Sequence, residues 1–152
     1  MSSTRKAYVL NGPNLNMLGK REPHLYGDVT LDQVENRCSE VAQELGFDLF
    51  FGQSNYEGQL IDWLHQAREE KAGVVINPAG LSFRSIPLVD ALKIIEQPII
   101  ECHVTNIHSR TEEVYHTSWV SPIATGVIAG VGTYGYELAL LALRRELDGK
   151  HA

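Results

Sequence analysis

The sequence predicts an α/β fold built on a doubly wound, parallel sheet of five strands. Short apolar runs of strand type alternate along the chain with segments whose apolar residues recur at helical spacing. The run Gly73–Ile76 (GVVI) has no polar side chain, as expected when helices cover both faces of a sheet. Strands that alternate with helices are joined by right-handed crossovers, so we expect them to lie parallel.

The first half of the chain is predicted to begin with a strand at Lys6–Leu10 (KAYVL). A helix is predicted over Thr30–Leu45, because its apolar residues form one stripe, Thr30 and Gln33 have capping-box spacing, and Gly46 follows as a stop. The next elements are a strand, a helix and a strand at Phe47–Gly52, Glu57–Lys71 and Gly73–Ile76.

The second half repeats the alternation. Ile86–Ile95 is predicted as a helix with Pro87 in its first turn. Two strands and a closing helix follow at Ile99–Val104, Gly126–Val131 and Tyr134–Leu147. No Pro/Ser-rich linker, repeat or low-complexity segment divides the sequence, and its hydrophobic content is 43%. We therefore expect one domain over residues 1–152.

Charge and composition argue against several classes of function. The formal net charge of −6 disfavours a nucleic-acid surface, and Arg144 and Arg145 are expected to complement a helix dipole instead. No apolar run approaches membrane-spanning length, and the start MSSTRKAY lacks an apolar signal core, so we expect a cytoplasmic location. Cys38 and Cys102 are predicted within a helix and a strand, which favours reduced, buried thiols over a disulfide or a metal pair.

The loop 11–27, which follows the first strand, is a candidate for catalytic chemistry. It is much longer than an ordinary βα connection, and long loops commonly act as lids or binding loops. Arg21 and Tyr26 are close enough in sequence to share one cavity, where a guanidinium would stabilise the phenolate and make Tyr26 a base. A solvated arginine and a packed ring would give the same spacing, so spacing alone leaves both interpretations open.

Polar residues also stand at or near the predicted ends of strands. Asn14 follows the first strand and Asn77 the third, at the sheet edge where open α/β folds bind ligands. Glu101 and His103 share one face of the fourth strand, so the carboxylate can stabilise a protonated imidazole. A surface glutamate and a core histidine are the alternative. His103 and His108 lack the spacing of a metal site, and the sequence has no G-x-S-x-G hydrolase elbow.

Several longer motifs resemble those of the type II 3-dehydroquinate dehydratases. They occur in that family's order and spacing and cover nearly the whole chain. The motifs are Asn11–Asn16 (NGPNLN), Gly19–Pro23 (GKREP), Tyr26–Gly27, Ile76–Gly80 (INPAG), Ile100–Asn106 (IECHVTN), Ser121–Gly126 (SPIATG) and Gly135–Tyr136. The resemblance implies a flavodoxin-like fold and a cofactor-independent anti elimination of water from 3-dehydroquinate, through an enolate, to 3-dehydroshikimate.

The resemblance also implies a role for each candidate residue. Tyr26, held as tyrosinate by Arg21, would be the base, and Asn14 would donate to the developing enolate oxygen. His103, oriented by Glu101, would protonate the departing hydroxyl. The substrate carboxylate would be held by Asn77 and by the backbone amides of Val104 and Thr105. Neither a metal nor another cofactor is implied.

Two positions depart from the family pattern at the distal, diol end of the substrate. Phe83 stands where the family usually has a histidine, and Val114 or Tyr115, depending on the alignment, stands where it commonly has an arginine. The candidate replacement contacts are Arg84, Arg110 and Tyr115. A paralogous lyase for a related cyclic hydroxy-keto acid therefore remains an alternative. A noncatalytic small-molecule-binding protein is a third, although binding alone does not require an acid and a base.

The resemblance further implies a homododecamer built from trimers. In such an assembly Asp90 would contact the substrate of a neighbouring subunit. The segment Thr125–Tyr136 is rich in glycine and small residues, which suits close packing between subunits. An ordinary buried strand and turn would have the same composition.

Overall fold

A five-stranded, all-parallel sheet forms the centre of the protein in the computed structural model, which describes residues 4–150. The strands are β1 (Arg5–Asn11), β2 (Phe47–Gln53), β3 (Gly73–Asn77), β4 (Ile99–His103) and β5 (Gly126–Ala129). Their order in the sheet is β2-β1-β3-β4-β5, and every neighbouring pair is parallel. The predicted five-stranded, doubly wound α/β architecture is therefore confirmed.

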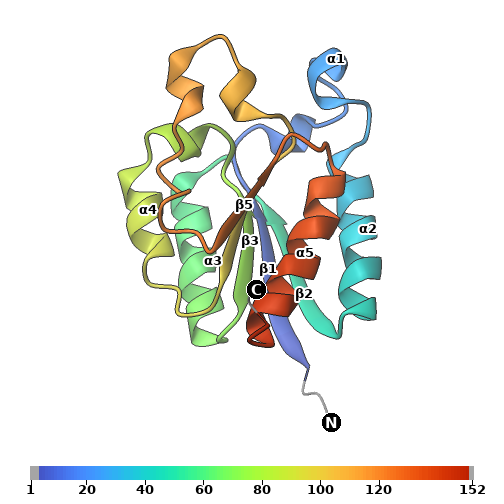
Figure 1. Cartoon of the computed structure of the whole chain (residues 1–152), viewed down its shortest axis with the longest axis vertical. Coiled ribbons are helices and arrows are strands. Elements are labelled where there is room, and N and C mark those ends of the chain that lie inside the picture. The colour runs from blue at the N-terminus through green and yellow to red at the C-terminus, as the bar shows by residue number, and fades with distance from the viewer. Residues whose placement is uncertain (1–3, 151–152) are drawn as a thin grey trace.

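Helices cover both faces of this sheet (Figure 1). The longer ones are α2 (Leu31–Glu44), α3 (Glu57–Glu69), α4 (Ile86–Leu92) and α5 (Tyr134–Leu147). The short ones are η1 (Leu15–Met17), α1 (Pro23–Tyr26), η2 (Ala79–Phe83), η3 (Ile107–Ser109) and η4 (Glu113–His116). Figure 1 shows α2 and α5 on one side of the sheet, α3 and α4 on the other, and α1 and the segment around residue 115 at the end of the molecule opposite the start of β1.

Each face of the sheet contributes to its own apolar core. In β1, Ala7 and Val9 pack with residues of α2 and α5, whereas Tyr8 and Leu10 pack with residues of α3 and α4. This two-sided burial explains why the central strands lack the polar alternation of a half-exposed sheet. Within residues 4–150, no helix has the length and apolar character needed to cross a bilayer.

Local capping fixes where α2 begins. The Thr30 hydroxyl accepts a hydrogen bond from the backbone N–H of Gln33 at 3.3 Å, and the Gln33 side-chain oxygen accepts one from the Thr30 N–H at 2.9 Å. Gly46, with a φ of 73°, follows in the left-handed conformation that glycine adopts without strain. The predicted capping box and glycine stop are confirmed.

Several predicted boundaries were wrong. The helix predicted to reach Ile95 ends at Leu92, because the chain tightens into a turn in which the Ile95 N–H bonds the Leu92 carbonyl before Pro98 leads into β4. The strand predicted to reach Val131 ends at Ala129. The cause is Gly130, whose φ of 94° breaks the extended backbone. The helix predicted to reach Lys71 ends at Glu69, and the segment predicted as a plain loop contains η1 and α1.

A buried polar network links α5 to the two central strands. The Tyr136 hydroxyl donates to Asn11 Oδ1 at 2.6 Å and accepts from Asn77 Nδ2 at 3.0 Å. Asn11 Nδ2 in turn donates to the Gly52 carbonyl at 3.1 Å. Burial raises the pKa of Tyr136 well above its ordinary value, so its hydroxyl stays neutral. The network holds Asn77, at the end of β3, in one orientation.

Replacing Tyr136 with phenylalanine should destabilise the fold, because the change removes the hydroxyl that bonds Asn11 Oδ1 and Asn77 Nδ2 in the buried network. We expect the Tyr136→Phe variant to lose about 1 to 3 kcal/mol in the free energy of unfolding, measured by urea denaturation. Tyr134→Phe is the matched control, since Tyr134 lies on the same helix with 55% of its surface exposed. Equal stability of the two variants would contradict the role given to the network.

Candidate active site

A cavity of about 200 Å³ lies at the carboxyl ends of β1, β3 and β4. This is the edge at which open α/β sheets bind ligands. It is smaller than the roughly 300 to 1,000 Å³ typical of drug-sized ligands, so it suits a small metabolite. Its lining residues are Pro13, Asn14, Leu15, Leu18, Arg21, Tyr26, Asn77, Ala79, Gly80, Phe83, His103, Val104, Thr105, Ile107, Arg110 and Tyr115.

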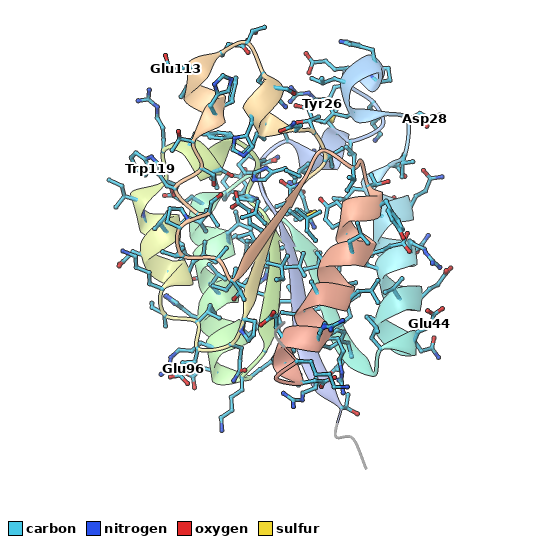
Figure 2. All side chains as sticks on the ribbon, in the orientation of Figure 1. Tyr26, Asp28, Glu44, Glu96, Glu113 and Trp119 are labelled. Carbon is cyan, nitrogen blue, oxygen red and sulfur yellow. The ribbon has the colours of Figure 1, made fainter. Side chains whose placement is uncertain are left out.

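Tyr26 covers the cavity from α1 and is bonded to an arginine far away in sequence. Its hydroxyl accepts a hydrogen bond from Arg110 Nη2 at 2.6 Å, and the same nitrogen donates to Thr105 Oγ1 at 3.2 Å. Figure 2 shows Tyr26 at the end of the molecule, between α1 and the segment that carries Glu113. The phenol therefore joins the two loops over the cavity.

Arg21 approaches Tyr26 in a different way. Its guanidinium carbon lies 5.5 Å from the centroid of the Tyr26 ring, and its Nη2 pairs with Glu22 at 3.2 Å. The sequence suggested Arg21 as the direct partner of the phenol because of its proximity along the chain. In the structure the hydroxyl is bonded by Arg110, which the sequence had assigned to the distal end of the substrate. No spacing signal connects residues 26 and 110.

His103 and Glu101 form a buried pair on β4. His103 Nε2 lies 2.5 Å from Glu101 Oε2, and the two side chains share one face of the strand, as predicted. Glu101 has no exposed surface, and its carboxylate also accepts hydrogen bonds from Ser118 and Ser121. Burial acts to raise the pKa of Glu101, but the hydrogen bonds from His103 and the two serines outweigh it and hold that pKa below its usual value.

Asn77 belongs to the buried polar network and also lines the cavity. One hydrogen of its Nδ2 goes to the Tyr136 hydroxyl, and its Oδ1 accepts from the Ala79 N–H at 3.2 Å. Because an amide nitrogen carries two hydrogens, Asn77 keeps one donor for the cavity that it lines.

Asn14 is held by the end of β2. Its φ of 72° is left-handed, a conformation that asparagine tolerates better than most residues. Its backbone N–H donates to Asn55 Oδ1 at 2.9 Å, and Gln53 Nε2 donates to the same oxygen at 3.1 Å. The sequence did not point to Asn55 or Gln53, since neither lies in a motif.

Aromatic residues form the wall at the other end of the cavity. The rings of Phe83 and Tyr115 meet edge to face with centroids 5.2 Å apart, and the Arg110 guanidinium lies 5.1 Å from the Tyr115 centroid. Val114 is 45% exposed and does not line the cavity, whereas Tyr115, the other residue considered for that position, does line it. Arg84 and Asp90 are also exposed and lie outside the lining.

Metal-ligating side chains do not gather in the described part of the chain. Within residues 4–150, no group of three or more His, Cys, Asp or Glu side chains is arranged to hold a metal ion. The polar groups that line the cavity are a phenol, an imidazole, amides and guanidinium groups. Their chemistry is that of proton transfer and of binding an anion.

Comparison with known proteins identifies the family. The family model described as Dehydroquinase class II matches residues 5–144. The 3-dehydroquinate dehydratase 1 of Agrobacterium fabrum is 57% identical over 136 residues, which cover 90% of this chain and 93% of that protein. The 3-dehydroquinate dehydratase 2 of Pseudomonas aeruginosa is 53% identical, with 90% and 92% covered.

A solved structure gives the same result. The type II dehydroquinase from Propionibacterium acnes superposes with a TM-score of 0.90 at 45% sequence identity, covering 95% of this chain and 99% of that one. The chain belongs to the dehydroquinase class II family. The resemblance inferred from the motifs is therefore confirmed.

The buried carboxylate predicts a pH-dependent contribution to stability. Because the pKa of Glu101 is lowered in the folded protein, its carboxylate stabilises the fold above the unfolded pKa of about 4.3, and this stabilisation is lost as pH falls through the lower folded pKa. Glu101→Gln should cost about 1.5 to 3 kcal/mol at pH 7, with a difference from wild type that shrinks below about pH 4.

The control for this measurement is Glu44→Gln, which removes an exposed carboxylate on α2, far from the cavity (Figure 2). Urea denaturation of both variants across this pH range gives the comparison. A Glu101→Gln penalty that stayed constant down to acid pH would show that the ionised carboxylate is not its source.

Proposed function

We propose that this protein is a hydro-lyase that dehydrates 3-dehydroquinate to 3-dehydroshikimate without a cofactor. One observation carries the proposal: a phenol bonded to a guanidinium and a histidine paired with a buried carboxylate line the same small cavity. Family membership supports the substrate, since curated relatives at 57% and 53% identity are named 3-dehydroquinate dehydratases.

The base in the proposed reaction is Tyr26. As phenolate it removes the proton next to the ketone, and the electron pair moves onto the carbonyl oxygen to give an enolate. Arg110, bonded to the phenol oxygen, and Arg21, over the ring, place positive charge beside Tyr26. Asn14, which lines the cavity, donates to the enolate oxygen directly or through water.

The acid is His103. The enolate collapses to form the carbon–carbon double bond and expels the hydroxyl, which leaves as water after taking a proton from the imidazole. Tyr26 lies on α1 in the loop after β1, His103 lies at the end of β4, and both line the cavity. We propose that they act on opposite faces of the substrate ring, which gives anti elimination.

The substrate carboxylate is the group we assign to the strand ends. Asn77 retains one amide hydrogen for it, and the backbone N–H groups of Val104 and Thr105 follow β4 at the cavity wall. Arg21 and Arg110 add positive charge to a protein whose net charge is −6, so an anion is attracted to this cavity rather than to the surface as a whole.

The distal end of the cavity supports a second candidate, a related lyase for a cyclic hydroxy-keto acid with fewer hydroxyl groups. The observation in its favour is the wall formed by Phe83 and Tyr115, where two aromatic rings meet edge to face. A wall of rings binds an apolar ring edge and offers few donors to a diol. We rank 3-dehydroquinate first because Arg110 and the Tyr115 hydroxyl remain as polar groups beside that wall.

Assembly and location complete the proposal. We propose a single-domain subunit that forms a homododecamer of four trimers. Asp90, exposed on α4 and outside the lining of its own cavity, is free in this arrangement to contact a neighbour's substrate. Cys38 and Cys102 are buried and unpaired, which is typical of the reducing cytoplasm.

The direct test is the ultraviolet absorbance of the enone formed from purified 3-dehydroquinate. Wild type should produce it, and Tyr26→Phe should lose at least about 100-fold in kcat, because the loss of general base catalysis costs roughly this much while the ring is kept. Tyr56→Phe is the control, since that ring is 77% exposed. Near-normal turnover by Tyr26→Phe would reject its role.

Arg110 and Arg21 should differ in their effect on turnover. Arg110→Gln removes a donor 2.6 Å from the phenol oxygen, whereas Arg21→Gln removes a charge that lies over the ring. We expect kcat to fall by about 100-fold or more for Arg110→Gln and by less for Arg21→Gln. A larger loss of kcat for Arg21→Gln would make Arg21 the main partner of the phenol, as the sequence suggested.

The aromatic wall should discriminate weakly between substrates at the distal end. We expect kcat/KM of the wild type for 3-dehydroquinate to exceed that for an analogue lacking one distal hydroxyl by less than about tenfold, since a hydrophobic wall detects a hydroxyl poorly. The Phe83→His/Tyr115→Arg variant should raise this ratio by about one to two decades through new hydrogen bonds. An unchanged ratio would show that the wall does not contact the diol.

A further inference from the structure

Two serines bond the carboxylate of Glu101, and neither takes part in the steps described above. Ser118 Oγ donates to Oε2 at 2.6 Å, and Ser121 Oγ donates to Oε1 at 2.5 Å. With His103 on Oε2, the carboxylate has three donors distributed over both of its oxygens. Since Glu101 has no exposed surface, these protein groups replace the hydration that the charge would have in water.

The position of Ser118 is determined by the segment that carries it. Its Oγ accepts a hydrogen bond from the Val120 N–H at 3.2 Å, so its own hydrogen is available for Glu101. The Trp119 N–H donates to the Ser82 carbonyl at 2.7 Å, and Val120 is fully buried. The segment therefore holds its serines at the carboxylate by backbone bonds and core packing.

The serines matter because one proton is shared between His103 and Glu101. With Nδ1 also protonated, that proton can remain on Nε2, giving an imidazolium–carboxylate ion pair, or move to the carboxylate, giving two neutral groups. Burial favours the neutral arrangement, since it penalises charge. Hydroxyl donors favour the ion pair, because they stabilise the carboxylate far more than the carboxylic acid.

The neighbouring strands of the sheet do not place charged groups beside Glu101 that would determine where this proton lies. At the register positions beside Glu101, β3 presents Ile76 and β5 presents Val127. Within residues 4–150, the titratable side chain bonded to Glu101 is His103. The titratable groups that share the cavity with His103 are Arg21, Tyr26, Arg110 and Tyr115, and none of these is a carboxylate.

We propose that Ser118 and Ser121 are positioning residues that keep the shared proton on the imidazole, so that His103 faces the substrate as a charged acid. This inference rests on the proposed role of His103. The serines act on the reaction only through Glu101, and they connect the acid to the segment that follows η4.

The charge of His103 can be measured without turnover. Solid-state NMR of the intact protein labelled with [15N]histidine distinguishes imidazolium from neutral imidazole, and a His103→Gln variant assigns the signal. At neutral pH we expect wild type to give imidazolium shifts at both ring nitrogens of His103. Ser118→Ala/Ser121→Ala should give the shifts of a neutral ring. Ser109→Ala is the control and should match wild type, because the Ser109 Oγ donates to the backbone carbonyl of Asn106 and not to Glu101.

Kinetics provides the second measurement. Ser121→Ala should lower kcat by about 10- to 100-fold, with KM within about twofold, because acid catalysis is weakened while binding is kept. Ser121→Thr should recover most of the loss, since it restores the hydroxyl. Ser121 is only partly buried, so these single variants are suited to the test even if the double variant does not fold.

The results separate this inference from the proposed function. Imidazolium shifts and unchanged kcat in the serine variants would overturn the inference while leaving the dehydratase activity in place. Absence of enone formation by wild type would overturn the proposed function, and the NMR comparison would still show whether the serines set the charge of His103. A neutral His103 in wild type would contradict the inference directly.

Discussion

The parallel arrangement of all five strands is the constraint on which the site depends. Parallel neighbours require a crossover between each pair, so every strand ends at the same edge of the sheet. Residues from β1, β3 and β4 therefore meet although they are far apart in sequence. Asn77 and His103 reach the cavity directly from strand ends, and the loop after β1 brings Tyr26 over them. The two apolar cores keep these strands in register beneath it.

The second constraint is the burial of charged groups in and beside a small cavity. Glu101 is fully buried, and its ionised form depends on donors from β4 and from the segment after η4. Tyr26 also lines the cavity, and its hydroxyl accepts a hydrogen bond from Arg110. Of the two proposed proton-transfer groups, Tyr26 has its charged partner on a different loop, whereas His103 has its partner on its own strand, β4. An elimination that removes one proton and returns another needs this separation of base and acid.

The sequence predicted the fold well and the contacts within the site only in part. Apolar periodicity and capping residues encode elements such as α2, and the spacing of Glu101 and His103 encodes a shared strand face. Contacts between distant loops have no such local signal. The bond from Arg110 to Tyr26 spans 84 positions, and the serines that hold Glu101 lie in a segment without regular structure. The predicted C-terminal ends of α3 and α4 were wrong, because turns end these helices before the apolar pattern does.

The proposed reaction requires base and acid on opposite faces of the substrate ring, and the stereochemistry of proton loss shows directly whether they lie there. The substrate is 3-dehydroquinate carrying deuterium in one of the two positions on the carbon next to the ketone, and mass spectrometry of the product shows which hydrogen is removed. Base and acid on opposite faces predict that deuterium anti to the departing hydroxyl is lost and that deuterium in the syn position is retained. Loss of the syn hydrogen would contradict this account of the site.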